Sequence, residues 1–139
     1  MQTVPNPLLQ QYIKLTEFLG LALGPDYEVA LHDLANKDHS IIAIANSHIS
    51  GRKLGAPLTN MALSILRDKS YERMDYHLHY YSINVNGKDL RSSTFFIKDH
   101  GKLIGLLCIN LGDSRYRAIS DHILKLCHQI GRASCRERV

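Results

Sequence analysis

The sequence predicts an α+β domain built on a five-stranded antiparallel sheet, with helices on one face and further helices at the N- and C-terminal ends. Apolar residues recur at helical spacing in residues 8–23, 58–66 and 116–130. Five other segments alternate in polarity or are rich in β-branched residues, which is typical of strands. The apolar faces of these elements must be buried against one another, so one sheet covered by helices is the simplest packing.

The N-terminal part of the chain is expected to contain a helix followed by two strands. Asn6 suits the N-cap and Pro7 the first helical position, while Gly24-Pro25 is a typical helix end. Residues 27–34 alternate between apolar and polar side chains, and residues 39–46 are mostly apolar and β-branched. Both patterns predict strands.

A loop, a helix, three more strands and a final helix are expected to follow. The loop, HISGRKLGAPLT at residues 48–59, leads into a helix that should begin at Pro57. Asn86-Gly87 is a strong hairpin signal because both residues tolerate a positive φ angle. The predicted strands cover residues 77–86, 90–99 and 102–111, and the final helix runs from Asp113 or Ser114 to Ile130.

The composition indicates a single domain in a reducing compartment. The chain has 139 residues, no stretch long enough to cross a membrane and no signal-peptide pattern, so we expect a cytoplasmic protein without a membrane partner. The odd number of cysteines (Cys108, Cys127 and Cys135) argues against a disulfide scaffold or a zinc site. Half of the net charge of +4 lies in residues 132–139, where we expect a foreign or disordered tail and not a nucleic-acid-binding surface.

Four stretches of the sequence resemble the YheO-like PAS domain family. They are LGPDYEVALHDL (23–34), SIIAIANSHISGRKLGAPLT (40–59), RSSTFFIKD (91–99) and KLIGLLCIN (102–110). The resemblance implies a PAS-like sensory domain at the N-terminus of a bacterial transcriptional regulator that has a C-terminal helix-turn-helix domain. It also implies relatives that regulate amino-acid utilisation.

The same resemblance sets our expectation for the domain organisation. Residues 1–131 should form the PAS-like sensory domain. We expect the helix-turn-helix domain to be absent from this chain, because no such pattern follows Gly131. DNA binding would then depend on a domain that this chain lacks.

Six polar residues are candidates for a small-molecule site. His32, Asn46 and Thr94 interrupt apolar strands and so need a partner in the protein or in a ligand. Others lie in the loop before a helix N-terminus, where Arg52 could pair bidentately with a carboxylate. We expect an unidentified ligand that is anionic or amino-acid-like. The alternative is that the loop is a structural corner, in which Gly51 and Gly55 satisfy the backbone geometry while Arg52 and Lys53 face water. The candidates are His32, Asn46, His48, Ser50, Arg52 and Thr94.

Metal binding and catalysis find little support in the sequence. Asp75, His77 and His79 could share one face of a strand, but no further residue completes a metal site. Cys108 lies in a continuous apolar run that is typical of a core. No catalytic motif is present, so we expect neither an enzyme nor a bound cofactor.

The sequence therefore favours a sensor domain that acts through a ligand-dependent change in conformation or in a homodimer. The final helix repeats apolar residues at positions 116, 119, 123, 126 and 130, which suits either pairing across a dimer or packing on its own sheet. The N-terminal helix is a second candidate for the dimer contact. Two alternatives stay open: a ligand-free PAS-type dimerisation module, and a sensor that holds haem or flavin.

Overall fold

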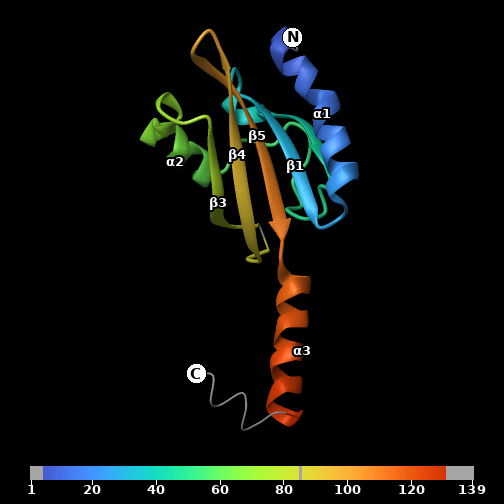
Figure 1. Ribbon diagram of the computed structural model, residues 1–139. Helices are drawn as coiled ribbons and strands as arrows, with labels where there is room; N and C mark the ends of the chain where they lie inside the picture. The colour runs from blue at the N-terminus through green and yellow to red at the C-terminus, as the bar shows by residue number, and fades with distance from the viewer. Residues whose placement is uncertain (1–4, 85, 131–139) are drawn as a thin grey trace.

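The computed structural model describes residues 5–84 and 86–130 and shows an α+β domain with one five-stranded sheet (Figure 1). The elements are α1 (Pro7–Leu23), β1 (Tyr27–Asp33), β2 (Ile41–Ala45), α2 (Asn60–Asp68), β3 (Tyr76–Ile83), β4 (Asp89–Asp99), β5 (Lys102–Gly112) and α3 (Ser114–Ile130). The strand order is β2-β1-β5-β4-β3, and all neighbouring strands are antiparallel. This architecture confirms the predicted fold class.

The outer face of the sheet, which carries Val29, Leu31 and Leu107, packs against α1. These residues are buried together with Leu9 of α1, which is fully inaccessible to solvent. Because side chains alternate along a strand, their neighbours in sequence point to the opposite face. α1 therefore lies mainly over β1, β2 and β5 and also packs with Ile97 of β4, while the rest of the outer face of β4 and that of β3 have no helix over them among the described residues.

The inner face of the sheet, which carries Phe96, Leu106 and Cys108, packs against α2. Leu58, just before α2, and Ile65 within it are buried against these strand residues. α2 is thus the helix that covers this face of the sheet. The N-terminal helix, which the sequence left unplaced, lies on the opposite face.

The ends of α1 follow the predicted capping chemistry. The Asn6 side chain accepts a 2.9 Å hydrogen bond from the Leu8 amide, and Pro7 is the first helical residue. Gly24 ends the helix with φ +93°, a conformation that other residues avoid.

The start of α2 and the turn between β3 and β4 differ in detail from the prediction. α2 begins at Asn60 and not at Pro57, because Thr59 is the N-cap and its hydroxyl accepts a 3.1 Å hydrogen bond from the Ala62 amide. The turn between β3 and β4 is organised by Asn84, whose side-chain oxygen accepts from the amides of Asn86 and Lys88 at 2.9 Å each. The hairpin itself is present as expected.

The final helix, α3, extends away from the end of the sheet (Figure 1). Every residue from 114 to 128 is exposed, so the described part of α3 does not pack on its own sheet. Four of the predicted apolar positions, Tyr116, Ile119, Ile123 and Leu126, are therefore open to a partner. The helix end expected at Gly131 and the tail expected over residues 132–139 lie outside the described residues. None of the described helices is long and apolar enough to span a membrane.

A close approach between α1 and β2 gives a test of this packing. A methyl group added to Gly20 would overlap the Ala45 side chain. We predict that Gly20→Ala lowers the free energy of unfolding by about 1–3 kcal/mol, since overpacking forces neighbouring atoms apart. Urea denaturation measures the change. Gln11→Ala, at an exposed position of the same helix, should be close to neutral; equal effects would show that α1 does not lie against β2 as described.

Candidate functional site

The loop between β2 and α2, residues 46–59, crosses the inner face of the sheet. Asn46, Gly51 and Gly55 all have positive φ angles, which lets the chain turn sharply at each of them. The Gly55 amide donates a 2.8 Å hydrogen bond to Ile41 O, and the Leu58 amide donates to Lys37 O. The loop is thus tied at its far end to the edge of the sheet.

A buried carboxylate, Glu28, connects this loop to the sheet. Only 1% of Glu28 is exposed. Its Oε2 accepts hydrogen bonds from the amide of Ser50 (3.0 Å) and from the Ser50 hydroxyl (2.5 Å), and its Oε1 accepts from Asn110 Nδ2 (3.0 Å). Glu28 is not among the site residues predicted from the sequence, although its place in β1, two residues from inward-facing Ala30, could have indicated it.

The Arg52 side chain lies over the same face, half-buried. Its Nη2 donates to Pro57 O, which is the only acceptor that the described residues give the guanidinium. Burial lowers the pKa of Arg52, and the nearby negative charge of Glu28 opposes that shift. The other N–H groups of the guanidinium have no acceptor among the described residues.

His32 is a buried, uncharged neighbour of this cluster. It is 2% exposed, and its Nδ1 lies 2.8 Å from Ser40 Oγ, with which it forms a hydrogen bond. Burial, with the positive charge of Arg52, lowers the pKa of His32 from 6.5 to about 4. The imidazole is therefore neutral at physiological pH.

A chain of hydrogen bonds continues across β3, β4 and β5. Tyr80 Oη lies 2.7 Å from Thr94 Oγ1, and Thr94 Oγ1 lies 3.4 Å from Cys108 Sγ. Burial raises the pKa of the Cys108 thiol to about 11 and also raises that of Tyr80, so both groups keep their protons. Cys108 thus occupies the core, as its apolar surroundings in the sequence predicted.

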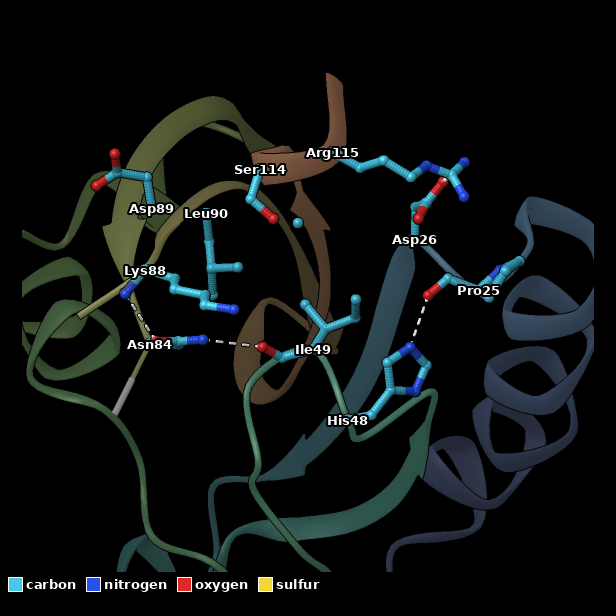
Figure 2. Close-up of a pocket in the computed structure, with 11 residues that line it drawn as sticks. Pro25, Asp26, His48, Ile49, Asn84, Lys88, Asp89, Leu90, Ser114 and Arg115 are labelled. Carbon is cyan, nitrogen blue, oxygen red and sulfur yellow. Dashed lines mark hydrogen bonds and ion pairs between the residues drawn. The ribbon is translucent and has the colours of Figure 1, made fainter. Parts of the chain in front are cut away.

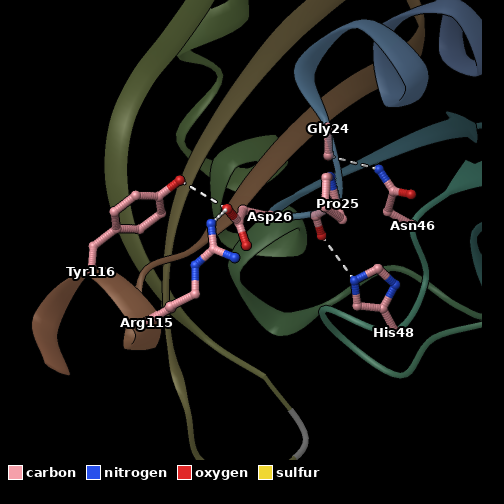
Figure 3. Close-up of polar contacts among 7 residues, drawn as sticks. All are labelled: Gly24, Pro25, Asp26, Asn46, His48, Arg115 and Tyr116. Carbon is pink, nitrogen blue, oxygen red and sulfur yellow. Dashed lines mark hydrogen bonds and ion pairs between the residues drawn. The ribbon is translucent and has the colours of Figure 1, made fainter. Parts of the chain in front are cut away.

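The structure brings together four of the six predicted site residues. His32, Ser50, Arg52 and Thr94 all belong to the inner-face cluster with Glu28. Asn46 and His48 lie apart from it, at the end of α1 (Figure 3). His48 Nε2 donates to Pro25 O at 2.8 Å.

The Asn46 side chain forms hydrogen bonds within the protein. Its Nδ2 lies 3.0 Å from Gly20 O, 3.0 Å from Gly24 O and 2.7 Å from Tyr27 O, all three of which can accept its hydrogen bonds. These contacts join α1, β1 and the start of the loop. A ligand role for Asn46 would need these bonds to break.

A cavity of about 310 Å³ lies where the sheet meets α3 (Figure 2). Its walls come from the turn before β1, the loop after β2, the β3–β4 turn and the first residues of α3. Charged side chains of both signs line it, together with the predicted site residue His48. They include Asp26, Asp89, Lys88 and Arg115.

The described residues contain no group of three or more His, Cys, Asp or Glu side chains that could hold a metal ion. The three residues Asp75, His77 and His79 therefore do not form such a group. His77 instead stacks on Tyr80, with ring centroids 5.1 Å apart.

Comparison with known proteins identifies relatives over most of the chain. The profile of the YheO-like PAS domain family matches residues 3–128. Over 105 residues, which are 75% of this chain, identity is 33% to the uncharacterized protein YheO of Escherichia coli (strain K12) and 32% to an uncharacterized protein of Haemophilus influenzae. The aligned region covers 44% and 47% of those two proteins, so this chain spans about half the length of its curated relatives.

Solved structures of low sequence identity also match. The PAS domain of a protein from Colwellia psychrerythraea has a TM-score of 0.48 and 16% identity, over 76% of this chain and 96% of that chain. An RNA-binding light-oxygen-voltage receptor has a TM-score of 0.49 and 11% identity, over 96% of this chain and 42% of that chain.

The buried imidazole of His32 makes stability depend on pH. Its pKa is about 4 when folded and 6.5 ordinarily, so the unfolded chain binds a proton between these values that the folded chain does not. Stability therefore falls as the pH drops from 6.5 to 4, by roughly 3 kcal/mol in total. We predict that His32→Asn, which cannot titrate, flattens urea-denaturation stability across this window. His122→Asn, on exposed α3, should leave the wild-type slope; an unchanged slope in His32→Asn would contradict the assignment.

Proposed function

Because the chain belongs to the YheO-like PAS domain family, we propose that it is the small-molecule-sensing domain of a bacterial transcriptional regulator. The ligand binds between the loop of residues 46–59 and the inner face of the sheet. It acts by changing the conformation of the domain or of a homodimer, and the protein works in the cytoplasm. Contact with DNA belongs to a helix-turn-helix domain outside the described residues.

The Arg52 guanidinium carries this proposal. It is a half-buried cation whose one acceptor among the described residues is Pro57 O, and it lies beside the polar inner face. A guanidinium in such surroundings favours an anionic partner, and a carboxylate matches its two parallel N–H groups. The ligand is therefore a small carboxylate or another amino-acid-like anion, with Ser50, His32 and Thr94 within the surrounding cluster.

Ligand binding on the inner face would have to compete with bonds that already exist. Ser50 is held by Glu28, and Arg52 by Pro57 O. A ligand that offers its own charges to Ser50 or Arg52 shifts the loop away from these partners. This is a population shift between two loop positions, driven by the ligand's preference for one of them.

A ligand-free dimerisation module is the second candidate, and one observation favours it. His32, Asn46 and Thr94 each have protein partners. Among the described residues, Asp113 Oδ1 is the only buried side-chain oxygen or nitrogen without a hydrogen-bond partner. A module of this kind needs no ligand to satisfy its interior.

Homodimerisation is part of both candidates, and the outer face offers a surface for it. Tyr76, Leu78 and Phe95 line an apolar groove of about 180 Å³ on β3 and β4, where α1 gives no cover. On α1, Phe18 and Leu21 are 63% and 80% exposed. Each copy thus has an uncovered sheet surface and an uncovered helix surface, which can pair in a symmetric dimer.

The sensing proposal is tested by a thermal-shift screen against amino acids of both enantiomers, small carboxylates and nucleotides. A ligand at about 100 times its Kd should raise Tm by roughly 6–12 °C. Arg52→Ala should abolish the shift for an anionic ligand, while Lys53→Ala, at the exposed neighbouring position, should preserve it. If no compound shifts Tm, and native mass spectrometry finds no co-purified molecule, the dimerisation module becomes the better description.

The dimer surface is tested by placing a charge in the outer-face groove. We predict that Leu78→Lys weakens dimerisation at least about tenfold, because a buried lysine lacks a counter-charge. Leu54→Lys, at an exposed position in the loop, should have little effect. Analytical ultracentrifugation measures both dissociation constants, and equal values would exclude the groove from the interface.

A further inference from the structure

The direction of α3 depends on contacts made by its first turn. The residues from 114 to 128 are all exposed, so buried apolar side chains do not fix this part of the helix on the sheet. The helix continues from β5, the central strand, through Gly112 and Asp113. Contacts at this junction therefore determine where the far end of α3 lies.

Two aspartates, one just before β1 and one at the start of β4, bond to the first turn from opposite sides. On one side, Asp26 Oδ2 accepts hydrogen bonds from Arg115 Nη2 and from Tyr116 Oη, both at 2.8 Å (Figure 3). On the other side, Asp89 Oδ2 accepts from Arg117 Nη1, also at 2.8 Å. Asp26 directly precedes β1, and Asp89 is the first residue of β4.

Helix geometry explains why the two arginines reach opposite sides. Positions i and i+2 lie about 200° apart around an α-helix, so Arg115 and Arg117 point in nearly opposite directions. β5 lies between β1 and β4 in the sheet. One arginine therefore meets the β1 side and the other the β4 side.

We propose that Asp26 and Asp89 are opposing positioning residues that set the direction of α3, and that loss of either one lets α3 tilt toward the other. Exposed ion pairs are individually weak, so neither side fixes the helix alone. The balance between them is therefore easily shifted. The cavity beneath the first turn (Figure 2) gives the helix room to move.

The ligand-binding loop contacts the same junction. The Ile49 side chain lies against Gly112, since a Cβ added to Gly112 would be 3.3 Å from Ile49 Cδ1. Asn84 Nδ2 donates a 3.0 Å hydrogen bond to Ile49 O, and Ile49 precedes Ser50, which Glu28 holds. A shift of the loop would thus reach the point where α3 leaves the sheet. Control of α3 by ligand binding at the loop rests on the proposed function, whereas the positioning of α3 by Asp26 and Asp89 does not.

The test measures the direction of α3 in the full chain without ligand. Spin labels are attached through unnatural amino acids at Ile83, exposed at the β3 end near the junction, and at Lys125 on α3. A tilt of about 20° moves the second label by roughly 6 Å. Double electron–electron resonance should show a shorter distance in Asp26→Asn, because α3 tilts toward β4. It should show a longer distance in Asp89→Asn.

Two further variants make the result specific. Exchanging the charges in Asp26→Arg/Arg115→Asp should restore the wild-type distance, because the pair is rebuilt. Asp121→Asn, on exposed α3 away from the junction, should not change it. Unchanged distances in both single variants, or shifts in the same direction, would overturn the proposal. A flat ligand screen together with opposite shifts would overturn only the sensing function.

Discussion

The contact between Glu28 and Ser50 is the interaction on which the inner face depends. A carboxylate that is 1% exposed requires hydrogen-bond donors, and the loop supplies two of the three. Satisfying Glu28 thus fixes the loop over the sheet, and that position directs Arg52 toward the inner face. The same contact places Ile49 against the junction with α3. One buried charge therefore organises both the candidate site and its connection to the final helix.

Asn46 fixes the start of the loop of residues 46–59. Its side chain bridges carbonyl groups of α1 and β1, with a positive φ angle at its own backbone. The loop is consequently held to the outer-face helix at its start and to the inner face at Ser50. Residues 46–50 are thus fixed by polar contacts at both ends. A ligand that replaces one of these contacts can therefore move the loop as a unit.

The sequence predicted those features that depend on local chemistry. The ends of α1 follow from Asn6, Pro7 and Gly24, and the strand patterns follow from alternation. Features that depend on distant contacts were missed or misplaced. Glu28 was overlooked because its donors come from the loop and β5. The contacts of Asn46 with α1 and β1 could not be predicted from the sequence either, because their partners are distant in the chain. The start of α2 is an exception among local features: it was placed at Pro57, since the competing cap at Thr59 was not recognised.

The chemistry of the interior bears on the choice between a sensor and a ligand-free module. A domain that serves only to dimerise gains nothing from a buried carboxylate, because well-packed apolar side chains are often as stabilising or more so. Glu28 and His32 nevertheless lie beneath a loop that carries Arg52. Polar contacts of this kind can be exchanged for those of a ligand with matching charges, whereas apolar contacts discriminate poorly between ligands. An inner face whose buried polar side chains have partners is therefore also what a ligand-responsive loop requires in its resting position.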